Sequence, residues 1–242
     1  MKKERDASGQ ELLAYFNRKE AHEIIERDDH FVDLSVYGPR SYFAEYKSWP
    51  KWQKQAVKYA HGKILDIGCG AGRVCLYLQS KGMDVTGIDV SPFAINVCKK
   101  RGVKQALVRS IEGIGKFHPD YFNTVIMFGN NFGLFGNFKK AKGLLKKLYT
   151  ITSKDAVILA ESTDPYKTDG YYAYHKHNLR KGRMAGQIRI RVRFRNYVGG
   201  WFDYLLVSKK EMVAILKGTG WGIKKTINSG KSVYIAVIRK IK

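Results

Sequence analysis

Acidic side chains, cysteine, proline and long apolar runs are all scarce in this sequence of 242 residues. Its three cysteines, Cys69, Cys75 and Cys98, are too few for a disulfide framework, and none forms the C-x-x-C pair typical of a metal site. We therefore expect a reducing, cytoplasmic setting and no metal. The five prolines are scattered and no low-complexity linker divides the chain, so a single domain over residues 1–242 is the simplest interpretation.

No stretch approaches the roughly 18 apolar residues that a membrane-spanning helix requires. The first residues, MKKERDASGQELLAYF, carry charges where a secretory signal would have an apolar run. We therefore expect a water-soluble protein without a membrane span.

The shortage of acidic residues leaves the chain strongly basic. Twenty-one Asp and Glu oppose 44 Lys and Arg, which gives a formal net charge of +23, and the excess concentrates in residues 151–242. Such a charge favours contact with polyanions or acidic metabolites. Nucleic acid, anionic lipid and small acidic compounds all remain open as partners.

Hydrophobic periodicity divides the chain into three kinds of segment. Residues 1–60 are polar and rich in aromatics, with Leu12, Leu13, Phe16, Ile24 and Ile25 at helical spacing, and we expect them to form a helical lid. Residues 61–165 alternate short apolar runs with amphipathic helices, which predicts a parallel sheet. Two further strands, WGIKKTINS and SVYIAVIRK, separated by a turn, predict an antiparallel end to the sheet.

Residues 185–207 contain QIRIRVRFRNYVGGWFDYLL, whose strict alternation predicts a β-hairpin turning at Gly199-Gly200. Arginines at 189, 191, 193 and 195 share one face of its first strand, so we expect an insertion on the acceptor side of the molecule. Repulsion between these like charges must be relieved by water or by an anionic partner such as phosphate. A solvated edge that resists strand pairing is the alternative.

The run from Ile64 to Arg73, ILDIGCGAGR, is a buried strand that leads into a glycine-rich turn and a helix. A dinucleotide fingerprint would need a third glycine where Arg73 stands. Asp66 would repel a pyrophosphate but suits a cofactor with an amino group and a sulfonium. Asp89 ends the next strand, where a carboxylate can accept hydrogen bonds from ribose hydroxyls. The alternative is that both aspartates are helix caps and the glycines form only a tight turn.

The runs LDIGCGAGR, GIDVSP and TVIMFGNN resemble the cofactor motifs of class I (Rossmann-like) S-adenosylmethionine-dependent methyltransferases, over residues 50–160. The resemblance implies an α/β fold with a seven-stranded, mostly parallel sheet, an antiparallel last strand inserted between its neighbours, and helices on both faces. It implies S-adenosyl-L-methionine as cofactor and S-adenosyl-L-homocysteine as product. The implied cofactor-binding residues are Asp66, Gly68, Cys69, Gly70, Ala71 and Gly72 at the methionine part, Asp89 and Val90 at the ribose and adenine, and Phe128 and Gly129 at the exit of the fourth strand.

The third strand departs from the family pattern, because no aspartate follows it directly. Ser110, Ile111 and Glu112 are the candidates for contacting the adenine amino group, with backbone contacts as the alternative.

The exit of the fourth strand, MFGNNFGLFG, lies at the edge of the sheet where the methyl group is expected. Asn130 and Asn131 are candidates for orienting the acceptor, with turn geometry as the alternative. Two prolines typical of enzymes that methylate amino groups of nucleobases or glutamine are missing, which disfavours that subclass. His175 is a further catalytic candidate because its pKa range suits proton transfer, although a solvent-facing loop histidine is the simpler interpretation.

The predicted acceptor side draws on several segments. Tyr42 and Tyr46 are spaced to share a helical face of the lid, together with other N-terminal aromatics such as Tyr37. The segment from Tyr166 through TDGYYAYHKHN has a composition suited to a loop that closes over an acceptor. The full set of acceptor-side residues is Tyr42, Tyr46, Phe132, Tyr166, Arg191 and Arg193, with core packing as the alternative for Phe132.

These observations favour methyl transfer from S-adenosylmethionine to an oxygen or nitrogen of a small-molecule acceptor, for which an anionic compound fits the basic charge. A tRNA or rRNA methyltransferase that uses the basic hairpin is the second hypothesis, because aromatic side chains lie among its arginines. A noncatalytic cofactor-binding or RNA-binding protein is the third. Monomer and homodimer are both compatible with the sequence.

Overall fold

The computed structural model describes residues 5–35, 38–168 and 172–241, so the predicted lid residue Tyr37 lies outside the described residues. The strands are β1 (Glu23–Arg27), β2 (Val32–Ser35), β3 (Ile64–Ile67), β4 (Val85–Asp89), β5 (Gln105–Val108), β6 (Phe122–Met127), β7 (Thr152–Thr163), β8 (Gln187–Phe194), β9 (Tyr197–Val198), β10 (Phe202–Leu205), β11 (Trp221–Asn228) and β12 (Val233–Lys240). The α-helices are α1 (Ala7–Phe16), α2 (Gly38–Phe43), α3 (Lys51–Ala56), α4 (Arg73–Ser80), α5 (Pro92–Lys100), α6 (Phe138–Ile151), α7 (Tyr172–Arg180) and α8 (Lys209–Leu216). Short 3₁₀ helices are η2 (Tyr46–Ser48), η3 (Val57–Tyr59), η4 (Ile111–Lys116), η5 (Asn131–Phe135) and η6 (Pro165–Lys167).

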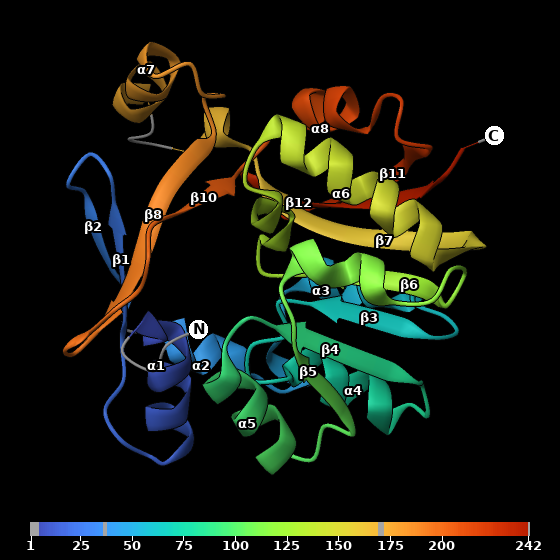
Figure 1. Ribbon diagram of the computed structural model, residues 1–242, viewed down its shortest axis with the longest axis horizontal. Helices are drawn as coiled ribbons and strands as arrows, with labels where there is room; N and C mark the ends of the chain where they lie inside the picture. The colour runs from blue at the N-terminus through green and yellow to red at the C-terminus, as the bar shows by residue number, and fades with distance from the viewer. Residues whose placement is uncertain (1–4, 36–37, 169–171, 242) are drawn as a thin grey trace. The chain divides into compact units, whose positions relative to one another are not determined.

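The described strands form two sheets (Figure 1). The seven-stranded sheet has the order β11-β12-β7-β6-β3-β4-β5, and the second has the order β10-β8-β1-β2, with β9 paired to β8. The last strand, β12, runs antiparallel to both of its neighbours, β11 and β7, while β6 and β7 are parallel. The predicted α/β fold with a mixed seven-stranded sheet and an inserted antiparallel last strand is therefore confirmed.

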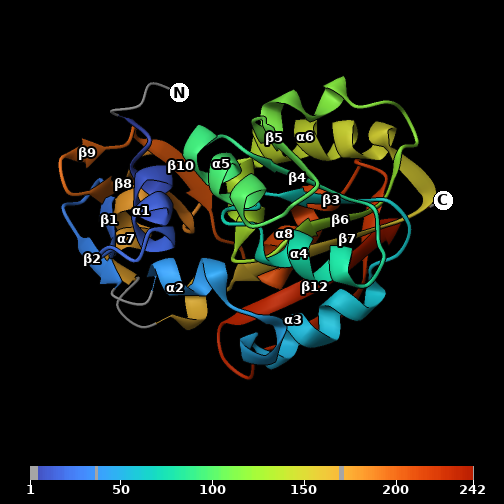
Figure 2. The same ribbon diagram turned by 90° about the horizontal axis from the view of Figure 1, so that it is seen from below.

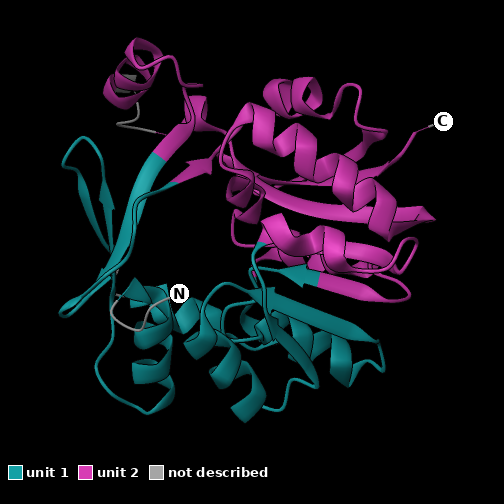
Figure 3. Ribbon diagram, in the orientation of Figure 1, with its two compact units in different colours: residues 1–49, 66–110, 189–202 teal, residues 50–65, 111–188, 203–242 magenta. Residues whose placement is uncertain are grey.

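Contacts divide the chain into two compact units, coloured in Figure 3. Unit 1 comprises residues 1–49, 66–110 and 189–202, and unit 2 comprises residues 50–65, 111–188 and 203–242. Each unit is thus assembled from three separate segments of sequence.

Unit 2 is built around β6, β7, β12 and β11. The helices α6 and α3 lie on opposite faces of these strands, as Figures 1 and 2 show, and α8 packs beside α6 and β11. The side chains of α6 explain its orientation, because Leu144, Leu145 and Leu148 are buried whereas its lysines face solvent. The core of this unit therefore lies between the helices and the strands.

Unit 1 places α4 and α5 against the parallel strands β4 and β5, and α1 packs along α5. Ser91 caps the N-terminus of α5 by accepting a hydrogen bond from Ala94, and Pro92 occupies the first turn, where its missing N–H is harmless. No helix among the described residues combines the length and apolar character needed to cross a membrane.

The helical prediction for residues 1–60 is wrong in part, because residues 23–27 and 32–35 are strands. The helix of this segment ends at Phe16, and β1 pairs antiparallel with both β2 and β8. Adjacent β-branched Ile24 and Ile25 suit a strand as well as a helix face, and the partner strand β8 decides between them.

The predicted hairpin is present, but its turn is not at Gly199-Gly200. Phe194 pairs with Tyr197, so β8 and β9 are joined by Arg195 and Asn196, and Arg195 takes the positive φ of +51°. The two glycines instead separate β9 from β10. Arg195 consequently belongs to the turn and not to the strand face that carries Arg191 and Arg193.

The segment predicted as a loop after Tyr166 is also different, because residues 172–180 form the helix α7. Its residues Ala173–Arg180 follow one another without glycine or proline, so nothing in this stretch opposes a helix.

Candidate cofactor site

The glycine-rich turn between β3 and α4 depends on left-handed backbone conformations. Gly68, Gly70 and Gly72 have φ values of +71°, +54° and +80°. A Cβ atom on Gly72 would also collide with the side chains of Val103 and Cys98. Only glycine meets both demands, so the turn keeps a bare backbone surface to which a ligand can approach closely.

Asp89, at the end of β4, is bonded to this turn. Its Oδ2 accepts a hydrogen bond from the backbone N–H of Gly70 at 3.1 Å, and its Oδ1 accepts one from the N–H of Ser91 at 2.9 Å. Burial raises the pKa of Asp89, while these two N–H groups oppose the rise. Each oxygen keeps a further lone pair, and the next side chain, Val90, is 51% exposed. An acceptor beside an open apolar surface fits a ribose and its adenine.

Asp66 lies at the other side of the turn and is 3% exposed. The thiol of Cys75 donates to its Oδ2 at 3.3 Å. Burial raises the pKa of Asp66 to about 6, and nearby Arg73 limits the increase. The carboxylate is therefore mostly ionised at neutral pH, which fits the positively charged amino group of a methionine moiety.

The cysteines support the turn from its buried side. The Sγ atoms of Cys69 and Cys98 lie 3.9 Å apart, and the Cys98 thiol donates to the carbonyl of Gly70 at 3.0 Å. Burial raises the pKa of Cys75 to about 12, against a lowering contact with Cys69. These thiols are protonated packing groups, so Cys69 can offer a ligand its backbone more readily than its sulfur. Ala71 is fully buried, and its carbonyl accepts a hydrogen bond from Arg101.

Helix α1 is attached to the turn that follows Asp89. Asp6 caps this helix by accepting from the N–H of Gly9 at 3.0 Å, and it also accepts from the Ser91 hydroxyl at 2.8 Å. A Cβ atom on Gly9 would overlap Ser91 Oγ, so glycine is required for this approach. Leu12 packs against Ala71 of the glycine-rich turn. The first helix of the predicted lid thus contacts the predicted cofactor residues.

Tyr42 and Tyr46 do not share a helical face, because α2 ends at Phe43. The ring of Tyr42 lies against Gly70, 3.0 Å from where a Cβ would stand, and its hydroxyl donates to Glu23 Oε1 at 3.0 Å. Tyr46 instead stacks on Tyr77, with centroids 4.2 Å apart and planes at 5°. Of these two tyrosines, Tyr42 has a described contact with the glycine-rich turn, whereas the described contacts of Tyr46 are with other residues.

In unit 2, the exit of β6 is fixed by a carboxylate that the sequence analysis did not select. Glu161 is 4% exposed and accepts from the N–H of Gly129 at 2.8 Å, from Gln53 Nε2 at 2.6 Å and from Trp52 Nε1 at 3.3 Å. Its signal in the sequence is a single charge inside the apolar run AVILAES. Phe128, next to Gly129, is 4% exposed and belongs to the core.

Asn130 and Asn131 lie directly after this point. Asn130 has φ +63°, its Oδ1 accepts from the Thr163 hydroxyl at 2.9 Å, and its carbonyl accepts from the Tyr204 hydroxyl at 2.7 Å. Asn131 begins η5. Phe132 is fully buried and meets Phe135 edge to face at 4.9 Å. In this structure Phe132 packs in the core of unit 2.

The candidates after β5 fall in both units. The N–H of Arg109 donates to the carbonyl of Asp89 at 2.8 Å, which keeps the end of β5 beside the end of β4 in unit 1, where Ser110 follows. Ile111 and Glu112 belong to unit 2. Glu112 binds Lys140 Nζ at 2.6 Å, and this contact lowers the pKa of Glu112. Its carboxylate therefore already has a cationic partner.

Tyr166 and His175 come together in a cavity of about 480 Å³ lined mainly by apolar atoms. Their rings meet edge to face at 5.2 Å, and the Tyr166 hydroxyl donates to Glu211 Oε1 at 2.8 Å. Burial and Glu211 raise the pKa of Tyr166 to about 12. His175 is 8% exposed and lies in α7, so it is not a solvent-facing loop histidine.

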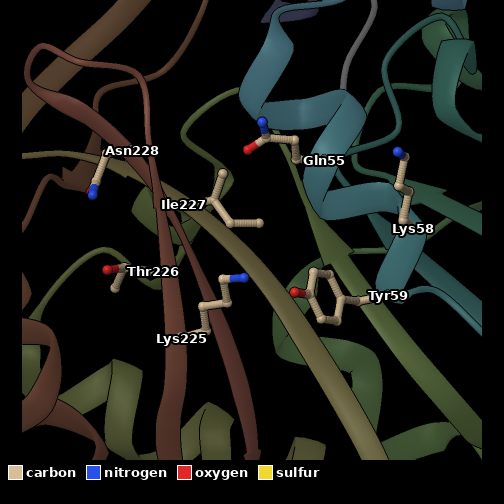
Figure 4. Close-up of a pocket in the computed structure, with 7 residues that line it drawn as sticks. All are labelled: Gln55, Lys58, Tyr59, Lys225, Thr226, Ile227 and Asn228. Atoms are coloured by element: carbon tan, nitrogen blue, oxygen red, sulfur yellow. The ribbon is translucent and has the colours of Figure 1, made fainter.

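A second cavity in unit 2, of about 560 Å³, contains none of the predicted site residues (Figure 4). Its lining residues are Gln55, Lys58, Tyr59, Lys225, Thr226, Ile227 and Asn228. Lys225 Nζ lies 5.9 Å from the centroid of the Tyr59 ring. This cavity is a basic groove between η3 and β11.

Two arginines of β8, Arg191 and Arg193, have side-chain partners within unit 1. Arg191 and Arg193 both donate to the carboxylate of Glu26 on the neighbouring strand β1. Arg191 also lies over the Trp201 ring, 4.6 Å from its centroid. The negative partner that this arginine face requires is thus supplied, for these two residues, by the protein itself. Among the described residues, no three His, Cys, Asp or Glu side chains gather as a metal site would require.

Comparison with known proteins agrees with this geometry. A family model described as "Methyltransferase domain" matches residues 64–155. YqeM of Bacillus subtilis, named as a methyltransferase, is 36% identical over 67 residues, which are 28% of this chain and 27% of that protein. The 2-heptyl-1-hydroxyquinolin-4(1H)-one methyltransferase of Mycobacteroides abscessus is 38% identical over 71 residues, 27% of this chain and 31% of that protein.

The chain spans only about a quarter to a third of the length of these curated relatives. A solved structure covers it completely: a methyltransferase from Bacteroides fragilis in complex with S-adenosyl-L-homocysteine has a TM-score of 0.84 and 24% identity over 100% of this chain and 98% of its own. Residues 64–155 are therefore similar in sequence to methyltransferase domains, and the chain has the fold of an S-adenosylmethionine-dependent methyltransferase.

Proposed function

We propose that this protein transfers a methyl group from S-adenosyl-L-methionine to an oxygen or nitrogen atom of a small-molecule acceptor. The observation that carries the proposal is the glycine-rich turn, whose Gly70 N–H is bonded to Asp89 and which lies between Asp89 and the ionised Asp66. This arrangement offers acceptors for the ribose and for a cationic amino group at the two ends of one bare backbone surface.

The cofactor, when bound, supplies an electrophilic methyl group on a sulfonium. The protein has to align an acceptor with that methyl group for in-line displacement and to keep water away. Asp66 and Asp89 would hold the two ends of the cofactor, and α1, attached through Asp6 and Ser91, would shield it. Asn130, Asn131 and His175 remain the candidates for orienting the acceptor or accepting its proton.

Three observations support a small acceptor. Arg191 and Arg193, the most distinctive feature favouring RNA in the sequence, bind Glu26. The relative from Mycobacteroides abscessus is named for a hydroxyquinolinone. The largely apolar cavity beside Tyr166 and His175 has a volume of about 480 Å³, which is large enough to bind a small organic molecule.

A tRNA or rRNA methyltransferase is the second candidate, because the net charge of +23 favours a polyanion. Binding of RNA would need several phosphate contacts, each of which releases counterions, so its affinity would fall steeply with salt. A small acceptor should give a shallow dependence on salt. Arg191→Ser combined with Arg193→Ser should reduce turnover of RNA and leave the cofactor affinity unchanged.

The test supplies the purified protein with radiolabelled S-adenosylmethionine and a fractionated cell extract. We expect label in a small extractable compound, and less labelling by an Asp89→Ala variant when the cofactor is limiting. Label in nuclease-sensitive polymer would overturn the small-acceptor proposal in favour of RNA. Cofactor binding without transfer to any fraction would overturn the enzymatic proposal and support a noncatalytic binding protein.

A further inference from the structure

Two carboxylates that no motif accounts for lie close to the glycine-rich turn within unit 1. Glu11 is on α1 and Glu23 is on β1, and their charges interact strongly enough for Glu23 to raise the pKa of Glu11. Neither residue belongs to the set that the sequence predicted. Their position and their lack of a cationic partner are the basis of the inference.

Glu11 is 1% exposed, and its Oε1 atom has no hydrogen-bond partner in the described part of the chain. On the same helix, the buried Nε2 atom of Gln10 also has none among those residues. Leaving a buried polar atom unsatisfied costs free energy, and a charged group costs more than a neutral one. Such atoms are usually satisfied by water or by a ligand.

A cation would relieve the repulsion within the pair. No lysine, arginine or histidine of the described residues forms an ion pair with Glu11 or Glu23. Burial, together with Glu23, raises the pKa of Glu11 to about 9, and burial also raises the pKa of Glu23, with Asp33 of β2 adding to the effect. Without a ligand the pair therefore holds a proton at neutral pH.

Tyr42 connects this pair to the cofactor turn. The edge of its ring that contains Cδ1 and Cε1 lies against Gly70, and its hydroxyl donates to Glu23 Oε1. Glu23 is thus linked to the turn through Tyr42, and it does not belong to the set formed by Asp66, Asp89 and the glycine backbone.

We propose that Glu11, Glu23 and the hydroxyl of Tyr42 bind a positively charged amino group of the methyl acceptor. This inference rests on the proposed methyltransferase function and narrows its substrate class to amine-bearing compounds. Leu13, Phe16 and Phe43 are partly buried next to the same turn and supply apolar surface for the remainder of such a molecule. The acceptor pocket would then discriminate against neutral and acidic compounds in spite of the basic net charge.

The α-ammonium group of the cofactor has the same chemistry as an acceptor amine, so the test must separate the two. The full-length protein is titrated with 2-phenylethylamine and with 2-phenylethanol, which differs only in its charged group, with and without S-adenosylhomocysteine. Wild type is compared with Glu11→Gln, Glu23→Gln and Tyr42→Phe. Glu20→Gln is the matched control, because the Glu20 side chain is 85% exposed.

We expect the amine to bind at least about tenfold more tightly than the alcohol, and Glu11→Gln and Glu23→Gln each to remove this preference. Tyr42→Phe should weaken amine binding by a smaller factor, and Glu20→Gln should not change it. Affinity for S-adenosylhomocysteine should remain within about twofold in every variant. Binding of the amine at pH 7 should also release a proton from the carboxylate pair, measured as a dependence of the binding heat on the buffer.

Equal binding of amine and alcohol, or no binding of either, would overturn the proposal, as would an unchanged amine preference in Glu11→Gln. A loss of S-adenosylhomocysteine affinity equal to the loss of amine affinity would also overturn it, because the carboxylates would then serve the cofactor. Failure of the wild type to bind S-adenosylhomocysteine at all would instead contradict the proposed function. The amine preference is also measured without S-adenosylhomocysteine, so the two failures can be told apart.

Discussion

The backbone N–H of Gly70 donates a hydrogen bond to the carboxylate of Asp89 across 3.1 Å. This bond joins two motifs that are 19 residues apart in the sequence and fixes the glycine-rich turn to the end of the neighbouring strand. The conformation of the turn and the orientation of the Asp89 carboxylate therefore depend on each other.

Asp89→Ala should weaken binding of S-adenosylhomocysteine by about 1–3 kcal/mol, because the variant would lose the proposed charge-assisted hydrogen bond to the ribose and would release the N–H groups of Gly70 and Ser91. Isothermal titration calorimetry measures this change. Asp155→Ala, at an exposed position of β7, is the control and should bind as wild type does. Unchanged affinity in Asp89→Ala would remove Asp89 from the cofactor site.

Cofactor affinity should decrease in acid because of Asp66. Its pKa of about 6 means that about one carboxylate in ten is ionised at pH 5, so affinity for the amino group should be roughly tenfold weaker there than at pH 8. Asp66→Asn should bind weakly at both pH values. Equal pH dependence in wild type and Asp66→Asn would exclude Asp66 as its source.

The stability of the fold should change with pH in the opposite sense. The folded protein holds the proton of Asp66 more tightly than the unfolded chain does, in which the pKa is 3.8. The contribution of Asp66 to the free energy of unfolding is therefore complete below pH 3.8, and about 3 kcal/mol of it is lost as pH rises through 6. Urea unfolding at pH 4 and pH 7.5 should show this difference in wild type relative to Asp66→Asn. An identical pH trend in the two proteins would contradict it.

Gly9→Ala should destabilise the protein by about 1–3 kcal/mol, because the new Cβ would overlap Ser91 Oγ and the Asp6 carboxylate. Displacement of α1 should weaken S-adenosylhomocysteine binding as well. Gly143→Ala is the matched control, since Gly143 lies within α6 with open space at its Cβ and alanine should add about 0.5–1 kcal/mol there. Urea unfolding compares the two, and equal stability of both variants would contradict the close approach at Gly9.

Glu26→Gln should lower the free energy of unfolding by about 1 kcal/mol at pH 7, a modest value because Arg193 is 41% exposed and solvent screens its contact. Arg193 and Arg191 lower the pKa of Glu26, so its contribution is present above the unfolded pKa of 4.5 and is lost as pH falls below it. The variant should therefore match wild type at low pH. Glu45→Gln, which removes an exposed pair with Lys47, should have no effect at either pH. A loss that persists in acid would contradict the ionic origin.

Local signals in the sequence were sufficient for the central sheet. Short apolar runs that alternate with amphipathic helices predicted β3 to β7, and two further apolar runs predicted the final strands, because these patterns are local in the sequence. Glycine spacing likewise located the turn that brings Gly70 to Asp89. The assignment of these residues to a bound cofactor remains a prediction.

Contacts between distant segments could not be predicted from local sequence patterns. The strand identity of Ile24 and Ile25 depends on pairing with Val192 and its neighbours, which no local pattern reveals. The hairpin turn was assigned to Gly199-Gly200 by composition, although strand register places it at Arg195. The contacts of Tyr42 with Gly70 and Glu23, like those of Glu161, arise only when separate elements pack together.

The pairing of β1 with β8 also determines when unit 1 can be completed during synthesis on the ribosome. Glu26 and its partner Arg191 are 165 residues apart in the sequence. At typical rates of translation, roughly ten to thirty seconds separate their synthesis. Throughout that interval the outer edge of β1 offers unpaired backbone groups to other chains. We therefore expect the nascent protein to need chaperones that cover this edge. A protein whose strands pair in the order of their synthesis should need them less.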